Sequence, residues 1–324
     1  MKAITIKQPG GAEQLRVQEF ENPTPKRGEL LVKVSAAAVN RTDILSRQKG
    51  HGYGSNPILG VEVAGTVEKI GPGVSTPVGT RVMGLVNGGG YAQYAVLPAS
   101  RAMEIPDNLS FEQAAAIPEV FLTAYQTLFW IGQLTLQETV LIHAGGSGVG
   151  TAAIQLAKQL TKSTVITTAG SQKKLDFCTS LGADVPINYK EQAFHEEVLK
   201  STQNLGVDLI LDFVGGSYWN KNLASIKVDG RWVLIGILGG AEVEKMNLLQ
   251  LMSKRIQLTG TMLTPRSDAY KAALTKEFAS KTMDLFGDNT LKPIVDSVFD
   301  LEQVQAAHQR MENNENIGKI ILRI

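Results

Sequence analysis

A glycine-rich segment from Ile142 to Lys158, IHAGGSGVGTAAIQLAK, constrains the fold more than any other part of this sequence. Four of its glycines fall within six residues, and small and apolar residues at helical spacing follow them. The preceding run, TVLIHA, has the length and composition of a buried strand. A strand that passes through a glycine loop into a helix is typical of a nucleotide-binding βαβ unit.

Apolar strands and helices continue to alternate on the carboxyl side of this segment. Expected strands cover 139–144, 163–169, 183–189, 207–214 and 230–237, and expected helices cover 148–160, 172–182, 196–203 and 218–226. This alternation predicts the α/β class, with a doubly wound parallel sheet covered by helices on both faces. The first third of the chain differs, because its strand-like runs, such as 30–39 and 62–71, are closely punctuated by glycine and proline. The final segment, 317–324, again has the character of an apolar strand.

Charge and cysteine content argue against several classes of partner. The net charge of +1 gives no electrostatic basis for nucleic acid or an anionic membrane as the main partner. Cys178 is the only cysteine, so no intrachain disulfide can form, and a reducing, cytoplasmic setting is expected. The first residues lack the apolar region of a signal peptide. The apolar stretch 114–132 contains Pro118, Glu119 and Gln126, and we interpret it as a buried helix rather than a membrane span.

The glycine loop nearly matches the pattern G-x-G-x-x-G, with Ser147 at the middle glycine position. We expect Gly145 to allow a tight turn and Gly150 to let the helix pack closely on the strand. The N–H groups at the start of the helix would then face a pyrophosphate. The cofactor-binding candidates of this loop are Gly145, Ser147, Gly148, Val149 and Gly150. A flexible turn that binds nothing is the alternative.

The end of the second expected strand indicates which nicotinamide cofactor would bind. NAD-binding folds place an Asp or Glu there, about 20 residues beyond the first glycine, to hold the ribose 2′-OH. Here the segment supplies Gly170, Ser171, Lys173 and Lys174, and the first acid, Asp176, lies inside the next helix. A hydroxyl and ammonium groups suit a 2′-phosphate, so the sequence predicts NADPH. A solvated lysine pair is the alternative.

Several segments, in order along the chain, resemble a known family. GVEVAGTVEKIGPGV followed by VGTRV resembles the signature of the medium-chain dehydrogenases/reductases. AVNRTD, AAAIPEVFLTAYQTL, HAGGSGVGTAAIQLAK, AGSQKKL, GGSYW and NIGKIIL are similar to segments of the zinc-free quinone oxidoreductases of the zeta-crystallin type. The resemblance covers essentially the whole chain. It implies a GroES-like, mainly β substrate domain at 1–120 and 262–324 and a Rossmann domain at 121–261. It also implies NADPH in the interdomain cleft and a homodimer or homotetramer.

The residues at the family's zinc positions argue against a metal site. Zinc-dependent relatives carry Gly-His-Glu where this chain has Gly60-Val61-Glu62, and a Cys ligand near the position of Asn40. The histidines are scattered along the chain without metal-ligand spacing: His51, His143, His195 and His308. We therefore predict no metal, and a core or surface role for each histidine.

A reductase without a metal needs an acceptor with its own electron sink, such as a quinone or a conjugated enal or enone. The protein would position the acceptor, exclude water and donate hydrogen bonds to the developing oxyanion. The resemblance implies that Asn40 faces the cleft near the nicotinamide ribose; an Asx turn in NRTD is the alternative. The family's pocket tyrosine corresponds to Tyr53 if the alignment is shifted and to His51 if it is not. We predict Asn40 and Tyr53 as the catalytic residues.

Four further positions are expected to contact the cofactor: Thr123, Tyr189, Gly215 and Leu238. Gly215 and Leu238 follow the fourth and fifth strands, where ligands bind in such sheets, although plain strand-to-helix turns explain the glycines there equally well. Three functions fit these features. They are an NADPH-dependent quinone reductase, an NADPH-dependent alkenal or enone double-bond reductase, and an NADPH-binding sensor or RNA-associated protein with little turnover. The near-neutral charge argues against RNA.

Overall fold

The computed structural model describes residues 1–324 and divides into two compact units. Unit 1 comprises Met1–Leu122 and Arg266–Ile324, and unit 2 comprises Thr123–Pro265. Unit 1 is therefore formed by both ends of the chain, and unit 2 is a single continuous segment.

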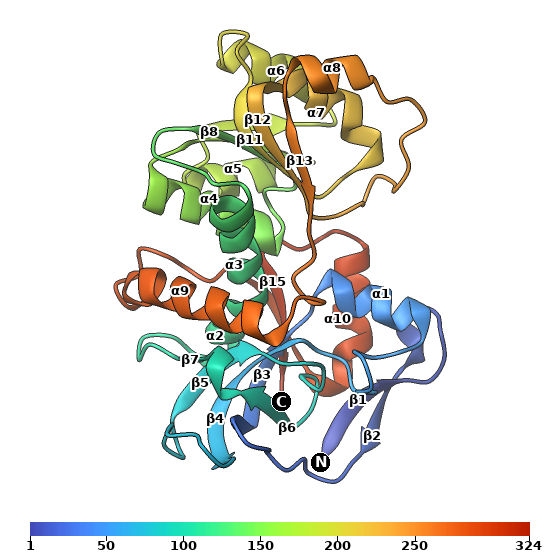
Figure 1. Cartoon of the computed structure of the whole chain (residues 1–324). Helices are drawn as coiled ribbons and strands as arrows, with labels where there is room; N and C mark the ends of the chain where they lie inside the picture. Colours follow the sequence, from blue (N-terminus) through green and yellow to red (C-terminus); the bar gives the residue numbers. More distant parts are fainter. The chain divides into compact units, whose positions relative to one another are not determined.

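Unit 2 is built on a parallel sheet of six strands in the order β10-β9-β8-β11-β12-β13 (Figure 1). The strands are β8 (Thr139–Ile142), β9 (Thr164–Ala169), β10 (Val185–Asn188), β11 (Val207–Asp212), β12 (Ile226–Leu234) and β13 (Gln257–Gly260). The first strand in the chain thus lies at the centre, and the chain moves outward first in one direction and then in the other. This is the doubly wound Rossmann order, whose ligand crevice lies at the carboxyl ends of the strands where the direction reverses.

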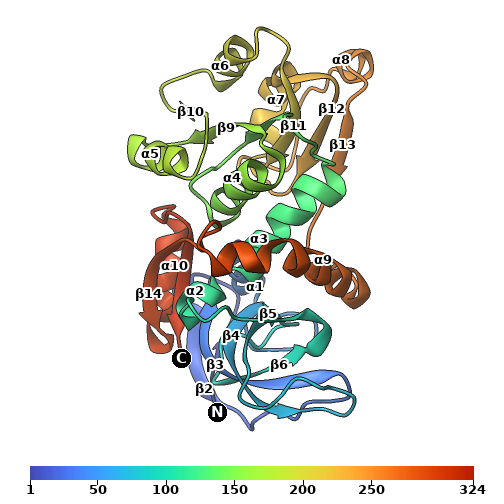
Figure 2. The same ribbon diagram turned by 90° about the vertical axis from the view of Figure 1, so that its left-hand side faces the viewer.

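Helices cover both faces of this sheet (Figure 2). They are α4 (Gly148–Thr161), α5 (Gln172–Ser180), α6 (Phe194–Ser201), α7 (Trp219–Ser225) and α8 (Leu248–Ser253), with the 3₁₀ turn η4 (Gly216–Tyr218). Phe194 of α6 and Trp219 of α7 pack in one cluster with strand residues such as Ile166 and Ile210. Crossovers between parallel strands are right-handed. The connections through α4 and α5 run from β8 toward β10, whereas the later connections run toward β13, so α4 and α5 lie on the opposite face of the sheet from α6 and α7. The predicted α/β class with a doubly wound sheet is confirmed.

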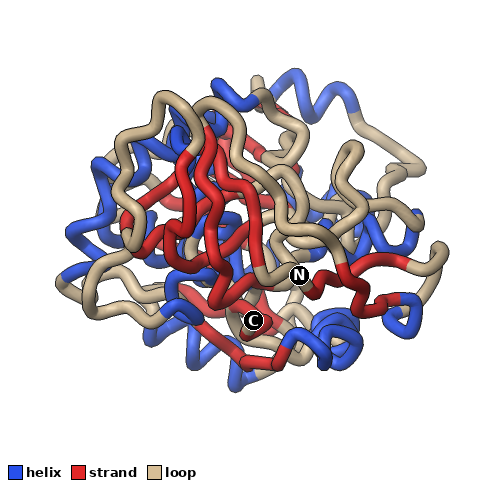
Figure 3. Tube along the Cα trace, turned by 90° about the horizontal axis from the view of Figure 1, so that it is seen from below, coloured by secondary structure: helices blue, strands red, loops and turns tan.

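Unit 1 contains a seven-stranded sheet in the order β14-β15-β3-β4-β5-β7, with β6 also paired to β3. These strands are β3 (Glu29–Ala38), β4 (Glu62–Ile70), β5 (Arg81–Leu85), β6 (Tyr94–Pro98), β7 (Ala102–Glu104), β14 (Val295–Asp300) and β15 (Lys319–Arg323). A separate hairpin joins β1 (Lys2–Ile6) and β2 (Leu15–Glu19). β15 pairs antiparallel with β3, so the last residues complete a sheet that begins near the N-terminus (Figure 3). Most of the strands of unit 1 thus come from the first third of the chain, and β14 and β15 come from its end.

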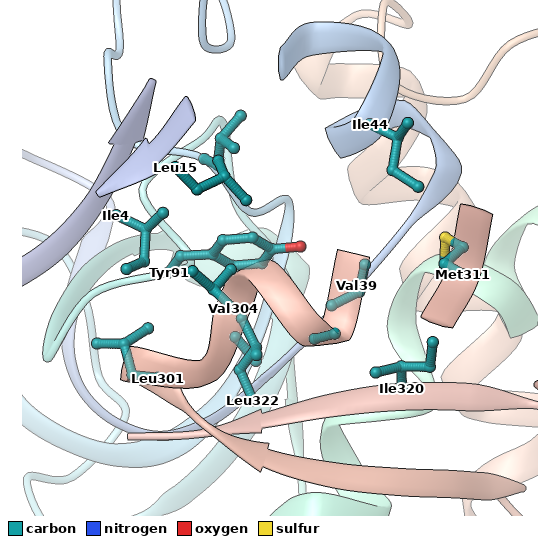
Figure 4. Packing of buried hydrophobic residues seen from close by; sticks show 13 residues of the cluster. Ile4, Leu15, Val39, Ile44, Tyr91, Leu301, Val304, Met311, Ile320 and Leu322 are labelled. Carbon is teal, nitrogen blue, oxygen red and sulfur yellow. The ribbon is translucent and has the colours of Figure 1, made fainter. Parts of the chain in front are cut away.

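Unit 1 also contains helices and 3₁₀ turns, some of which pack with its strands in a second core cluster. They are α1 (Arg41–Lys49), α2 (Phe111–Ala115), α9 (Asp268–Gly287) and α10 (Val304–Glu312), with 3₁₀ turns η1 (Ala12–Gln14), η2 (Ala99–Arg101) and η5 (Leu301–Gln303). The Tyr91 ring lies among Ile4, Leu15 and Val304, and its hydroxyl oxygen lies at one end of the ring within the cluster (Figure 4). That hydroxyl is fully buried and requires a polar partner.

The apolar stretch 114–132 is not the single helix that the sequence predicts. α2 ends at Ala115, and a second helix, α3 (Pro118–Tyr125), continues into a π-helical segment, η3 (Gln126–Ile131). The break has a local cause, because Pro118 has no N–H to continue α2 but suits the first position of a new helix. No helix in the structure is both long enough and apolar enough to cross a membrane.

Candidate functional site

The glycine loop joins β8 to α4 at the carboxyl edge of the unit 2 sheet. Ser147 is the N-cap of α4, and its Oγ accepts the Gly150 N–H at 3.0 Å. A Cβ atom on Gly150 would overlap the Ala144 carbonyl oxygen and lie 2.8 Å from the Gly145 Cα. Glycine is therefore required at this position if α4 is to start so close to the loop, as the sequence predicts.

The reason for Gly145 differs from the expected one. Ala144, with φ of 51°, occupies the left-handed conformation of the turn, and Gly145 does not. A Cβ on Gly145 would instead overlap the Thr167 Oγ1 of β9 and lie 3.0 Å from the Cys178 Sγ of α5. Gly145 is thus fixed by close packing against the neighbouring strand and helix, whereas the turn is made by the residue before it.

The end of β9 lies beside this loop. The Lys174 side chain covers Gly146, since a Cβ built on Gly146 would be 3.2 Å from the Lys174 Cδ. Ser171 caps α5 through the Lys174 N–H at 3.5 Å, and Lys173 is exposed. The structure therefore brings the predicted 2′-phosphate residues onto the same edge as the glycine loop.

Tyr189 follows β10 at the same edge and is 44% exposed. A Cβ on Gly170 would lie 2.7 Å from its hydroxyl and 3.2 Å from the Lys190 Cε. The patch formed by Gly146, Gly170, Lys174 and Tyr189 combines backbone left bare by glycine, an aromatic ring and an ammonium group. A phosphorylated nucleotide is a chemical fit to this set, because bare backbone and the start of α4 accommodate pyrophosphate and lysine accommodates a further phosphate.

The loops after β11 and β12 touch each other. Gly215 has φ of 78°, and a Cβ there would lie 2.8 Å from the Gly240 carbonyl oxygen. Leu238, 59% exposed, donates its N–H to the Phe213 carbonyl at 3.1 Å. Thr123 lies on α3, with its carbonyl accepting a hydrogen bond from the Thr127 hydroxyl at 2.8 Å. No hydrogen bond joins Thr123 to these loops.

A buried hydrogen-bond network, which the sequence analysis did not predict, lies beneath the loops at this edge of the sheet. His143 Nε2 lies 2.7 Å from the Asn222 Oδ1, and His143 Nδ1 lies 2.9 Å from the Thr168 Oγ1. Asn222 donates its amide to Asp212 at 3.0 Å, and Asp212 accepts the Gly215 N–H at 3.0 Å. Burial lowers the pKa of His143, so the ring is neutral and acts as donor and acceptor in this chain. The network connects the loop after β8 to the loop after β11.

In unit 1, Asn40 lies at the junction of β3 and α1, and its amide is fully engaged. Its Nδ2 donates to the Glu62 Oε1 at 2.8 Å and to the Ala38 carbonyl at 3.2 Å. Its Oδ1 accepts from the Lys319 Nζ at 2.6 Å, and the same ammonium bonds the Glu62 Oε1 at 2.8 Å. The ion pair between Lys319 and Glu62 is almost completely buried. Its hydrogen bonds fix which way the Asn40 amide points.

Asp43 connects Asn40 to Tyr53. Its carboxylate accepts the Tyr53 hydroxyl at 2.8 Å, the Tyr91 hydroxyl at 2.8 Å and the Asn40 backbone N–H at 2.7 Å. Burial raises the pKa of Asp43 to about 6, although these donors and the nearby Lys319 ammonium act in the opposite direction. Burial and the Asp43 charge raise the pKa of Tyr53 above its usual range. Both predicted catalytic residues therefore lie on one network.

The competing position, His51, is not part of that network. It is exposed in the loop after α1, and its Nδ1 lies 3.1 Å from the Gly52 carbonyl oxygen. Tyr53 is partly buried and packs against the core cluster that includes Tyr91. Of the two residues, the structure connects only Tyr53 to Asn40.

A third carboxyl, Glu119, lies at the start of α3 beside this network. Its backbone N–H donates to the Glu62 Oε2 at 2.7 Å. Burial, followed by the charge of Glu62, raises the pKa of its carboxyl to about 8. A sequence signal was available for part of this set: Asp43 falls three residues after Asn40, which is helix-start spacing, and Glu62 and Lys319 are charged residues within apolar strands.

The structure contains no group of three or more His, Cys, Asp or Glu side chains arranged to hold a metal ion.

Comparisons with known proteins match both units. An alcohol dehydrogenase GroES-like domain matches residues 26–107, and a zinc-binding dehydrogenase domain matches residues 148–280. The synaptic vesicle membrane protein VAT-1 homolog-like of Mus musculus is 32% identical over 344 residues, which cover 99% of this chain and 81% of that protein. The quinone oxidoreductase of Pongo abelii is 30% identical over 331 residues, which cover 99% of this chain and 97% of that protein.

Among solved structures, the Escherichia coli quinone oxidoreductase complexed with NADPH superposes with a TM-score of 0.91. It is 29% identical to this chain, and the match covers 100% of both chains.

Proposed function

This chain belongs to the zinc-free quinone oxidoreductase group of the medium-chain dehydrogenases/reductases, and on that basis we propose that it reduces quinones with NADPH by hydride transfer. The relatives directly support an NAD(P)H-dependent oxidoreductase. We propose in addition that quinones are the acceptors and that NADPH is the hydride donor.

The bonding of Asn40 carries the proposal. Zinc-dependent relatives have a Cys ligand near this position and a His at that of Val61. Here the Asn40 amide bonds the Glu62 carboxylate at 2.8 Å and the Lys319 ammonium at 2.6 Å. These groups provide hydrogen bonds and charge, which suit an acceptor whose own π-system takes up the electrons. Quinones are such acceptors.

Each part of the chain then has a role in the reaction. Bound NADPH supplies the hydride. The glycine loop and the start of α4 bind its pyrophosphate, and Lys174 binds the 2′-phosphate. Tyr53 orients the acceptor, and Asn40 positions the surrounding groups, with its amide on Glu62 and Lys319 and its N–H on Asp43. In the structure the Tyr53 hydroxyl donates a hydrogen bond to Asp43 at 2.8 Å, so it must leave that carboxylate before it can donate to an acceptor oxygen. Tyr91 and the Asn40 N–H then remain bonded to the Asp43 Oδ2, whereas the Asp43 Oδ1 loses the donor that it has in the structure.

The proposed contact between Lys174 and the 2′-phosphate of NADPH predicts a specific effect of Lys174→Ala. This change should weaken NADPH binding by about 10- to 100-fold, since a hydrogen bond to a charged group contributes about 1.5–3 kcal/mol. NADH, which lacks the 2′-phosphate, should be almost unaffected. Dissociation constants for both cofactors, measured by fluorescence titration, check this. Lys200→Ala, on the exposed surface of α6, is the control. Equal affinities for NADPH and NADH in the unaltered protein would contradict the assignment.

The acceptor is tested by NADPH oxidation assays with quinones, 2-alkenals and enones. The proposal requires the highest kcat/KM with quinones. A higher value with 2-alkenals would identify a double-bond reductase, which the same groups could support because both reactions are conjugate reductions. NADPH binding without turnover on any of these acceptors would favour a nucleotide sensor.

A further inference from the structure

Reduction of a quinone or enone requires a proton as well as a hydride, and the network around Asn40 contains more carboxyl groups than cations. Asp43, Glu62 and Glu119 lie together, and Lys319 is the cation bonded within the group. Burying several like charges with fewer counter-charges is unfavourable, so such a group tends to retain a proton. The geometry shows which carboxyl is best placed to hold it.

Glu62 and Asp43 are satisfied as carboxylates. Glu62 Oε1 accepts from Lys319 and Asn40, each at 2.8 Å, and its Oε2 accepts the Glu119 N–H at 2.7 Å. Asp43 accepts two phenol hydroxyls and a backbone N–H. No hydrogen bond or ion pair is made to the Glu119 carboxyl. The N–H at the start of α3 that could have stabilised its charge is already bonded to Glu62.

Asp43, Glu62 and Glu119 also differ in solvent exposure. Asp43 and Glu62 are each 0% exposed, whereas Glu119 keeps part of its surface exposed. Glu119 is therefore the only one of these three residues that reaches the surface, which favours it as the one to meet a bound molecule.

We propose that Glu119 is the general acid of the reaction and donates its carboxyl proton to the acceptor oxygen. This inference rests on the proposed function. Both electrons reach the acceptor with the hydride from NADPH, which becomes NADP⁺. The O–H bond of the Glu119 carboxyl breaks, a new O–H bond forms on the reduced acceptor, and water reprotonates the Glu119 carboxylate after product release. Atoms and charge balance, because one hydride and one proton convert a quinone to a hydroquinone.

The other acidic groups of unit 1 are poorer donors. The Tyr53 phenol has a pKa raised above its usual range, and Tyr91 is fully buried. Burial and the Arg47 charge lower the pKa of His308 to about 3, so it is neutral at physiological pH. His51 lies outside the network.

The charges that face Glu119 come from four elements. Glu62 of β4 and Asp43 of α1 raise the pKa of the Glu119 carboxyl, and Lys319 of β15 and Lys271 of α9 lower it. Burial raises this pKa more than either charge does, and the resulting pKa of about 8 leaves Glu119 protonated at neutral pH. The acid form is lost as the pH rises through that value, so turnover should fall above about pH 8.

The test compares the pH dependence of kcat in the full-length protein and in Glu119→Gln, which keeps the side chain's shape. For an enone, Glu119→Gln should lower kcat at pH 7 by about 100-fold and remove the decline above pH 8. For a quinone the loss should be smaller, because a hydroquinone anion is a weaker base than an enolate. Glu119→Asp should restore part of kcat and the decline. Glu104→Gln, an exposed carboxyl of β7, is the control.

NADPH affinity should be unchanged in Glu119→Gln, which separates an effect on chemistry from misfolding. An unchanged kcat and pH profile in an active protein would overturn the assignment of Glu119 and leave the proposed function standing. Absence of turnover in the unaltered protein would overturn the proposed function itself. Whether Glu119 holds a proton can then be tested without turnover. Infrared spectra at pH 7 should show a protonated carboxyl band that Glu119→Gln removes. If that band is absent from the unaltered protein, Glu119 holds no proton.

Discussion

Tyr53 and Tyr91 donate to the same carboxylate, Asp43, but differ in exposure. Tyr91 is 0% exposed within the core cluster, whereas Tyr53 is only partly buried. Only Tyr53 can therefore exchange Asp43 for an acceptor oxygen. Tyr53→Phe should lower kcat and kcat/KM together, by a small factor for a quinone and up to about 100-fold for an enone. Steady-state kinetics with both acceptors, and an unchanged NADPH dissociation constant, check this.

Two variants control for indirect effects at Tyr53. Tyr91→Phe removes an equivalent hydrogen bond from Asp43, so it reports the cost of losing one donor there, which is about 1–3 kcal/mol for a buried charged group. We expect it to lower the melting temperature and to reduce kcat less than Tyr53→Phe. His51→Ala should leave turnover unchanged. A large loss in His51→Ala with none in Tyr53→Phe would assign the pocket position to His51.

At the scale of elements, the sequence predicts β8 to β12 and α4 to α7 of unit 2, because the central strands are buried on both faces. Strands such as β8 and β11 are therefore recognisable as short apolar runs between helices. The sequence does not predict α8 or the exposed edge strand β13. The polar network of unit 1 has no comparable signal. Asn40, Glu62 and Lys319 come from distant parts of the sequence and meet only because β15 pairs with β3. The break at Pro118 is not predicted, because the sequence analysis uses this proline as an argument against a membrane span and not as a helix boundary.

The junction of β8 and α4 gives the prediction at this scale. Gly150→Val should weaken NADPH binding by roughly tenfold or more, because its side chain would collide with the Ala144 carbonyl and push α4 away from the loop. Circular dichroism should show that the helices and sheets persist. Gly287→Val, at the end of α9, is the control, since nothing lies within 4 Å of a Cβ there. Retained NADPH affinity in Gly150→Val would show that the nucleotide binds elsewhere.

At the scale of the whole molecule, the β13 edge of unit 2 has features that suit an interface with a second copy. β13 is the terminal strand of the six-stranded sheet, and its outer backbone groups have no strand partner. Apolar side chains are exposed near it in sequence, on α8 and beyond β13: Leu248 (59%), Leu249 (73%), Met252 (71%) and Met262 (72%). An open strand edge and exposed apolar side chains are both features that proteins bury in an interface.

We therefore expect a homodimer, or a homotetramer built from it, whose interface includes β13 and α8. Replacing Leu249 and Met252 together with glutamate should shift the protein toward the monomer in analytical ultracentrifugation, because burying two carboxylates in an apolar interface costs several kcal/mol. Leu205→Glu is a matched control, since Leu205 is also 73% exposed but lies in the loop between α6 and β11. It should leave the association state unchanged. If the double variant sediments as the unaltered protein does, or if the unaltered protein is a monomer, this edge is not an interface, and the exposed side chains of α8 need another explanation.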